Sequence, residues 1–145
     1  MSLTDLYREI ILEHARHPQH KGSLAEPVSF QAGLNNPTCG DEVIVQVRVG
    51  PGGTIEEGKF DGVGCSISMA AASIMSGMVA GRTLAEAKQL IDAYTAMVSG
   101  KQAPTDELAE LAAFAGVAQF PMRVKCATLP FHALQKGIAR YEEGF

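Results

Sequence analysis

Three cysteines and one aspartate are the residues of this chain whose types suit metal chemistry. Cys39 and Asp41 are two positions apart, whereas Cys65 and Cys126 come much later in the chain. These are all the cysteines, and no two of them form a Cys-x-x-Cys pair. Three thiolates and a carboxylate suit a tetrahedral ion such as Zn²⁺, or the iron of an iron–sulfur cluster. We therefore expect the fold to gather these four side chains around one metal site.

The aspartate would make this site different from a purely structural zinc site. Three thiolates on Zn²⁺ give one net negative charge, and Asp41 adds a second. A carboxylate oxygen is a harder ligand than sulfur and exchanges more readily, so Asp41 can leave the metal and open a coordination position. A structural zinc site with four cysteines stays closed, whereas a site with this donor set would be labile.

The residues around each cysteine suggest how it is presented. Gly62 and Gly64 remove side chains beside Cys65, which allows the backbone to approach closely. A helix is expected to begin just after Cys65, and another near Cys126. The positive end of a helix favours a thiolate, and the Arg-Val-Lys sequence before Cys126 adds two cations there. Both thiols are therefore expected to ionise readily.

Composition excludes several classes of function. The 145 residues carry a net charge of −4, which is not the basic footprint of a nucleic-acid-binding protein. The sequence has no secretory signal pattern and no apolar run near the ~20 residues of a membrane helix. We expect a soluble, cytoplasmic protein that binds neither nucleic acid nor membrane. In that reducing compartment an odd number of cysteines indicates thiols or ligands rather than disulfides.

The elements that must position these residues change in type along the chain. Residues 2–17 show apolar residues at helical spacing, and Pro18 ends the pattern. Apolar residues then alternate over 28–34 and 43–49, and more weakly over 54–61, with a Gly-Pro-Gly-Gly turn before the third segment. Short links between three strands predict an antiparallel meander.

Helical patterns follow the strands. Residues 66–80 are apolar on all sides, which predicts a buried helix that ends at Gly81. Further helices are expected over about 83–98, from 105 onward, and near the C-terminus with Pro130 in the first turn. The order predicts an α+β fold in which a small three-stranded antiparallel sheet is covered by about five helices. We expect residues 1–145 to form a single domain.

The assembled motifs resemble the U-type iron–sulfur cluster assembly family, which comprises IscU, SufU and the N-terminal part of NifU. The resemblance covers nearly the whole chain and rests on residues 6–14 (LYREIILEH), 36–41 (NPTCGD), 62–68 (GVGCSIS) and 123–134 (RVKCATLPFHAL). Scaffold-type members carry a histidine immediately before the third cysteine, and Lys125 has that position here. Residues 120–125 replace their Leu-Pro-Pro-Val-Lys motif, and the segment between Cys65 and Cys126 is long. Both features resemble the SufU branch.

This resemblance implies a zinc site formed by Cys39, Asp41, Cys65 and Cys126. It also implies a PLP-dependent cysteine desulfurase of the SufS type as partner, which passes a persulfide sulfur to Cys39, and a place in the SUF assembly complex. Arg123 would act in docking or in freeing the acceptor thiol from zinc. The chain would then be a sulfur acceptor and carrier rather than a stand-alone enzyme.

Other functions remain open at this point. The same donor set could bind iron or serve as a scaffold for a [2Fe–2S] cluster that is handed to apo-proteins, although the histidine of scaffold-type members is absent. A structural zinc domain that binds a protein partner is a third hypothesis, and a Cys/His hydrolase using His132 is a fourth. His132 is more simply read as a packing or docking residue, since no acidic residue is adjacent to it in sequence.

Overall fold

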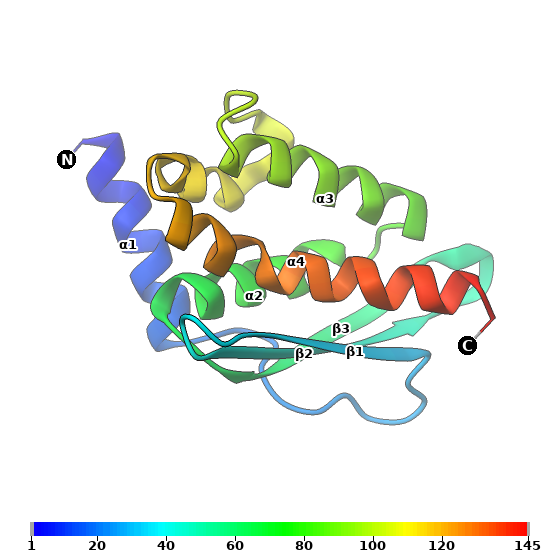
Figure 1. The fold of residues 1–145 in the computed structure, drawn as a ribbon. Helices are drawn as coiled ribbons and strands as arrows, with labels where there is room; N and C mark the ends of the chain where they lie inside the picture. Colours follow the sequence, from blue (N-terminus) through cyan, green and yellow to red (C-terminus); the bar gives the residue numbers. More distant parts are fainter. Residues whose placement is uncertain (1, 145) are drawn as a thin grey trace.

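The computed structural model describes residues 2–144. Its elements follow in the order α1 (Leu3–Arg16), β1 (Phe30–Asn36), β2 (Asp41–Val49), the short 3₁₀ turn η1 (Pro51–Gly53), β3 (Ile55–Val63), α2 (Ser66–Val79), α3 (Leu84–Val98), the 3₁₀ segment η2 (Asp106–Gln119) and α4 (Pro121–Glu142). Figure 1 shows the helices together on one side of the sheet. The predicted α+β fold is therefore confirmed.

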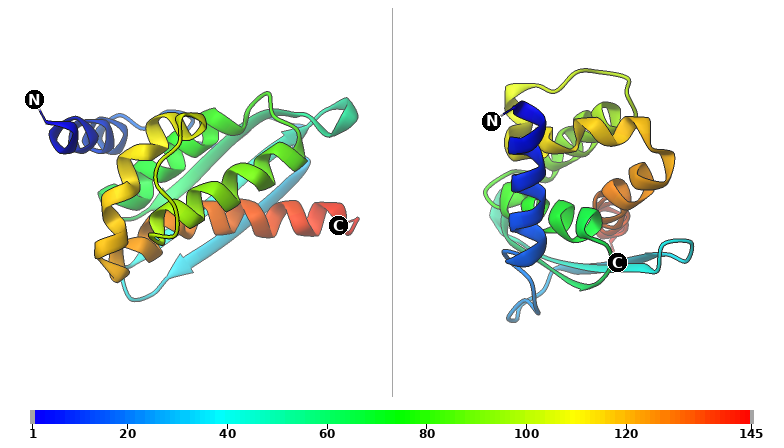
Figure 2. Two further views of the ribbon diagram at one scale, coloured as in Figure 1. Left: turned by 90° about the horizontal axis from the view of Figure 1, so that it is seen from above. Right: turned by 90° about the vertical axis from the view of Figure 1, so that its left-hand side faces the viewer.

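The three strands form one antiparallel sheet in the order β1-β2-β3. Val45 in the central strand is paired with Ala32 on one side and Phe60 on the other. Paired residues of neighbouring strands point to the same face of the sheet, and all three of these side chains are buried. The apolar alternation in the sequence thus fixes which face of the sheet receives the helices, and Figure 2 shows those helices over the strands from above.

Helix α2 lies at the centre of the helical layer, in contact with α1, α4 and β3. Most of its side chains are buried, including those of Ser73 and Ser76. The predicted buried helix is confirmed, and Cys65 is its N-cap residue. Strand β3 ends only two residues before Cys65, so this cysteine lies in the short link between the sheet and the start of α2.

The N-terminal helix is attached to α2 through a buried histidine. His14 Nδ1 lies 2.8 Å from Ser73 Oγ, which also accepts a hydrogen bond from the backbone N–H of Gln19 at 2.8 Å. On its other side, His14 Nε2 lies 3.4 Å from a carboxylate oxygen of Glu110 in η2. These contacts fix α1 against two other elements, and α1 forms one wall of the groove described below.

The last helix differs from its prediction. It begins at Pro121 rather than near Cys126, so Pro130 lies inside the helix instead of in its first turn. A helix tolerates Pro121 at its start because the first N–H groups have no helical partner. Burial of the middle of α4 against the sheet and α2 offsets the hydrogen bond that Pro130 removes.

The segment between α3 and α4 also differs from the expected third helix. It is a 3₁₀ segment, and Ala109 interrupts it with a φ of 48°. Its apolar side chains Leu108, Leu111 and Phe114 are nevertheless fully buried. The sequence predicted a helix from residue 105 onward, and the structure has a 3₁₀ segment over Asp106–Gln119 instead. Among the described residues, no helix is long and apolar enough to cross a membrane.

Candidate metal centre

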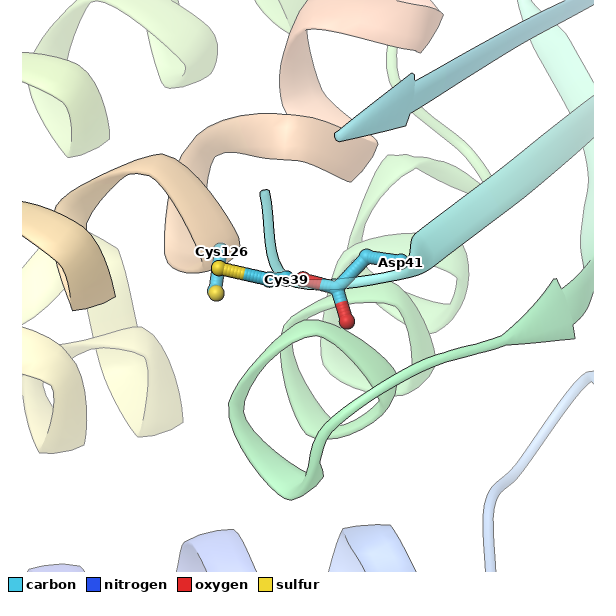
Figure 3. A group of neighbouring side chains, drawn as sticks. All are labelled: Cys39, Asp41 and Cys126. Atoms are coloured by element: carbon cyan, nitrogen blue, oxygen red, sulfur yellow. The ribbon is translucent and has the colours of Figure 1, made fainter. Parts of the chain in front are cut away.

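Cys39, Asp41 and Cys126 come together in the structure. One sulfur or oxygen atom from each residue lies within 4.8 Å of the others. Figure 3 shows the sulfur atoms of Cys39 and Cys126 next to one another and the carboxylate of Asp41 beside them. Cys39 lies in the turn between β1 and β2, Asp41 is the first residue of β2, and Cys126 lies in the second turn of α4. The fold thus joins candidate ligands that are far apart in the sequence.

This donor set fits a tetrahedral dication. With Zn–S bonds of about 2.3 Å, neighbouring tetrahedral ligands are about 3.8 Å apart. The observed separations are within 4.8 Å, so small side-chain movements would complete this geometry. Asp41 is only 1% exposed and Cys126 only 4%. Buried anionic ligands are costly without a counter-charge, and a bound cation supplies one.

Cys65 is at the margin of this group. Its sulfur lies 3.9 Å from Asp41 Oδ2 and 3.7 Å from Ser68 Oγ, and its side chain is exposed. Its backbone N–H donates a 2.8 Å hydrogen bond to Asp41 Oδ1. The structure therefore gathers three of the expected ligands tightly and places the fourth beside Asp41. That all four bind one metal stays a prediction.

The acidity of Cys126 differs from expectation. Burial raises the pKa of its thiol strongly, and hydrogen bonding with Asp41, Cys39 and Cys65 raises it further. The sequence predicted a helix start here, but α4 begins five residues earlier and the Arg123 and Lys125 side chains are exposed. Neither the helix end nor these cations therefore offsets the burial. Without a cation, Cys126 holds its proton, and metal binding must release it.

The turn that carries Cys39 is held by only a few bonds. The carbonyl of Asn36 accepts hydrogen bonds from the backbone N–H groups of Cys39 and Gly40, at 3.1 and 2.9 Å. Gly40 has a φ of +73°, a conformation that glycine adopts without strain. Cys39 therefore lies on a short loop whose displacement would break no strand pairing.

The two glycines before Cys65 behave as predicted. A β-carbon on Gly64 would lie 2.6 Å from Asp41 Oδ1 and 2.5 Å from Ser68 Oγ. Gly62 has a φ of +137°, and a β-carbon there would collide with the carbonyl of Glu42. Close approach of β3 to the start of β2 thus requires glycine at both positions, and this approach brings Cys65 to Asp41.

An open groove of about 870 Å³ leads to the thiols. It is bounded by α1, the start of α2, the end of η2 and the start of α4, and all three cysteines line it. Its walls are mainly apolar, with the cations Arg8 and Arg123 among the lining residues. Several apolar side chains at this end of the molecule are exposed, namely Leu3, Leu6, Val63, Phe120 and Met122.

Arg123 and His132 occupy different surroundings. Arg123 is exposed, and its guanidinium carbon lies 5.1 Å from the centre of the Phe120 ring at the groove. His132 does not line this groove but a separate polar cavity between α3 and α4, together with Asp92 and Lys101. His132 and the cysteines thus line different cavities, and the geometry gives no support to a Cys/His hydrolase.

Sequence reasoning missed two residues near the site. Ser68 is fully buried, donates to the carbonyl of Cys65 at 3.2 Å and lies against its sulfur. A serine three residues after an N-cap is a signal that could have identified it. Tyr94 donates to the carbonyl of Ala127, next to Cys126, at 2.8 Å. Nothing in the local sequence links Tyr94 to Cys126, because the contact joins two helices.

Comparison with known proteins adds independent information. Residues 6–127 match the NifU-like N terminal domain family. The chain is 40% identical over 144 residues to the zinc-dependent sulfurtransferase SufU of Bacillus subtilis (strain 168), covering 99% of this chain and 96% of that protein. It is 41% identical over 139 residues to the iron–sulfur cluster assembly scaffold protein IscU of Streptococcus pyogenes serotype M1, covering 95% of this chain and 86% of that protein.

Solved structures show the same fold. A putative iron–sulfur cluster assembly scaffold protein for the SUF system from Fervidobacterium islandicum AW-1 aligns with a TM-score of 0.79 and 30% identity, over 94% of this chain and 99% of that one. A NifU-like protein (N-terminal) from Brucella abortus aligns with a TM-score of 0.86 and 28% identity, over 99% of both chains. The likeness therefore extends over the sheet, the helices and the segments that carry the candidate ligands.

Proposed function

Because this chain belongs to the family of NifU-like N-terminal domains, we propose that it is a zinc-dependent sulfurtransferase of iron–sulfur cluster assembly. Its substrate is a persulfide sulfur carried by a cysteine desulfurase of the SufS type, and its acceptor is Cys39. The main observation is that a loop thiol, which lines an open groove, is paired with a buried carboxylate. Likeness to the B. subtilis SufU supports the same assignment.

Among the three thiols, Cys39 is the one that can move at least cost. Cys126 is buried within α4, and Cys65 is the N-cap of α2 with its N–H bonded to Asp41. Cys39 is half-buried on a turn between two strands. Displacing it toward the groove would leave the sheet and both helices intact, so it is best suited to meet a second protein.

The transfer step conserves atoms and electrons. The Cys39 thiolate attacks the outer, sulfane sulfur of the donor's persulfide. A new S–S bond forms to Cys39 as the donor's S–S bond breaks, and the electron pair of that bond leaves with the donor cysteine as its thiolate. The transferred sulfane sulfur keeps its proton, so the products are a Cys39 persulfide and a free donor thiolate. No external oxidant or reductant is required.

Cys39, Asp41 and Cys126, with Cys65 beside them, are the residues that would hold zinc. When bound, Zn²⁺ keeps coordinated thiols deprotonated while moderating their reactivity. Oδ1 of the Asp41 carboxylate accepts a hydrogen bond from the Cys65 N–H, and Oδ2 is the second oxygen that the same group could offer to a metal. Asp41 can therefore exchange without becoming a buried, unpaired anion.

The groove also supports a protein partner as the sulfur donor. Its apolar walls suit a segment that carries a thiol into a site from which water is largely displaced. Arg8 and Arg123 offer positive charge to an acidic or anionic group on that segment. Arg123 is available for this contact, since its guanidinium rests on the Phe120 ring and forms no ion pair with any residue between 2 and 144.

Mapping the transferred sulfur tests this proposal. Zinc-loaded protein is mixed with a SufS-type desulfurase and cysteine, then trapped with an alkylating reagent and analysed by peptide mass spectrometry. We expect the additional sulfur on the peptide that contains Cys39, and its loss in Cys39→Ala. Full stimulation of the desulfurase by Cys39→Ala, or sulfur found only on Cys65, would contradict the assignment.

A scaffold function is the second candidate, and the 41% identity to the S. pyogenes IscU favours it. In that case a [2Fe–2S] cluster would be the cargo, held by the same donor set. Anaerobic reconstitution with iron and sulfide discriminates between the two functions by visible absorption. A stable cluster that passes to an apo-protein would support the scaffold, whereas zinc retention with sulfur on Cys39 supports the transferase.

A further inference from the structure

The long segment between α2 and α4 contacts the backbone that carries Cys126. Tyr94 in α3 is fully buried, and its ring stacks on Phe131 of α4 with 3.9 Å between ring centres and 19° between ring planes. Its hydroxyl donates a 2.8 Å hydrogen bond to the carbonyl of Ala127. Packing requires only the ring, so the hydroxyl has a separate role at the residue that follows Cys126.

The backbone of α4 is unusual at this point. Pro130 has no N–H, so the carbonyl four residues before it, that of Cys126, lacks its normal helical donor. The proline ring also crowds that carbonyl and bends the helix, and Figure 1 shows α4 changing direction along its length. The Thr128 hydroxyl donates a 2.9 Å hydrogen bond to the carbonyl of Val124, two residues before Cys126.

Side chains therefore replace or supplement the regular helical bonds on both sides of Cys126. Before Cys126, the Thr128 hydroxyl bonds the carbonyl of Val124. The carbonyl of Cys126 itself has no helical donor because of Pro130. After Cys126, the Tyr94 hydroxyl bonds the carbonyl of Ala127. A helical turn with fewer internal bonds is less fixed in direction. Of these three residues, only Tyr94 belongs to a different element, so its hydrogen bond links the backbone of this turn to α3.

We propose that Tyr94 is a positioning residue for Cys126, and that its hydroxyl sets the direction in which the turn presents the sulfur to Cys39 and Asp41. The proposal rests on the proposed metal site. Partners outside the ligand shell orient ligands and typically change metal affinity by about 10- to 100-fold. Burial raises the pKa of the Tyr94 hydroxyl well above its usual value, so it remains a proton donor at any working pH.

This role explains why the segment is attached where it is. Phe114 of η2 packs edge-on against Tyr94, with 6.0 Å between ring centres and 75° between planes. Tyr94, Phe114 and Phe131 thus form one aromatic cluster that holds α3 and η2 against α4. Besides lining the groove through η2, the segment between α2 and α4 therefore packs against the helix that carries Cys126.

Removing only the hydroxyl tests the proposal. Tyr94→Phe keeps the stacked ring, and Thr95→Val is the matched control, because the neighbouring Thr95 hydroxyl is buried and has no hydrogen-bond partner among the described residues. Zinc affinity is measured by competition with a chromophoric chelator, and thiolate coordination by the charge-transfer absorption of bound Co²⁺. We expect Tyr94→Phe to bind zinc about 10-fold more weakly with an altered Co²⁺ spectrum. Thr95→Val should match the wild type within about twofold.

Thermal unfolding with and without zinc separates positioning from general stability. A merely structural hydroxyl would lower Tm equally in both forms, whereas a positioning hydroxyl reduces the gain in Tm that zinc produces. Tyr94→Phe with wild-type affinity, or with an unchanged zinc-induced gain, overturns the proposal. So does loss of the native circular dichroism, because the hydroxyl would then support the whole fold. A wild-type protein that binds no zinc would instead refute the metal site itself.

Discussion

The backbone N–H of Cys65 donates a 2.8 Å hydrogen bond to Asp41 Oδ1, which joins one candidate ligand to the main chain of another. The carboxylate thereby lies at the N-terminus of α2, where helix dipole and unpaired N–H groups favour an anion. Asp41 thus has two functions in one position: it accepts the N–H of the residue that precedes a buried helix, and it lies beside the thiols of Cys39 and Cys126.

Asp41→Ala should affect both functions at once. Loss of the carboxylate removes one metal ligand, and it leaves the Cys65 N–H unpaired at a cost of about 1 kcal/mol. We expect weaker zinc binding in chelator competition together with a lower urea midpoint of the metal-free protein. Asp92→Ala, which changes an exposed aspartate on α3, serves as the control and should alter neither quantity.

Gly64→Ala should distort the site without removing a ligand. Its β-carbon would lie 2.6 Å from Asp41 Oδ1, so the strand end or the carboxylate must shift. We expect a loss of about 1–3 kcal/mol in unfolding free energy and a weaker zinc site. Gly116→Ala is a matched comparison, because a β-carbon there meets no atom within 4 Å. Equal behaviour of the two variants in urea unfolding would contradict this account.

The buried thiol of Cys126 predicts a dependence of stability on pH. Its pKa is raised in the folded, metal-free protein, chiefly by burial. The unfolded chain loses this proton above about pH 8.5 while the folded chain keeps it, so stability falls as pH rises beyond that value. Below it, this group contributes no pH dependence. Urea unfolding of metal-free wild type and Cys126→Ala at pH 8 and pH 10 checks the sign, since only the wild type has this contribution.

Two buried serines of α2 should respond differently to substitution. Ser73→Ala removes the partner shared by His14 Nδ1, which is buried, and the Gln19 N–H, which is partly buried. We expect a cost of about 1–3 kcal/mol. Ser76→Ala should be nearly neutral, because its hydroxyl bonds only a carbonyl of its own helix, that of Ala72. Similar urea midpoints for the two variants would show that the His14 contacts add little.

Arg123→Ala should weaken the encounter with the desulfurase while leaving the metal site intact. Arg123 is exposed beside the groove, and its charge acts on a partner rather than on the buried ligands. We expect the concentration needed for half-maximal stimulation to rise about fivefold or more, and the effect to shrink at high salt. Arg140→Ala, far along α4, is the control. An unchanged stimulation curve for Arg123→Ala would remove this residue from the docking surface.

Much of this fold was predictable because its patterns are local. Alternation in β1 and β2 and the uniformly apolar α2 each report the burial of their own element, and all three were predicted. The start of α4 was not, since Pro121 and Pro130 are both compatible with a first turn and only packing decides between them. Ala109 interrupts η2 at a residue whose type gives no sign of a break.

The candidate site was predictable for a different reason. Cysteine is rare in this chain, so a shared site could be inferred without knowing the path between its three copies. The structure gathers Cys39 and Cys126 with Asp41 and places Cys65 at the margin of that group. Acidity was not predictable in this way. The pKa of the Cys126 thiol depends on how completely α4 and its neighbours bury it, and burial is a property of the assembled fold. Tyr94 was missed for the same reason, since its contact with Ala127 crosses between helices.

A cation shared by Cys39 and Cys126 would have a mechanical consequence. These ligands bracket most of the chain, including two strands, two helices and η2. Joining them would act as a reversible cross-link, and clips that close long loops reduce the entropy of the unfolded chain the most. Loading or removal of metal would then tighten or loosen the whole molecule, so that a protease could distinguish the two forms at sites distant from the thiols.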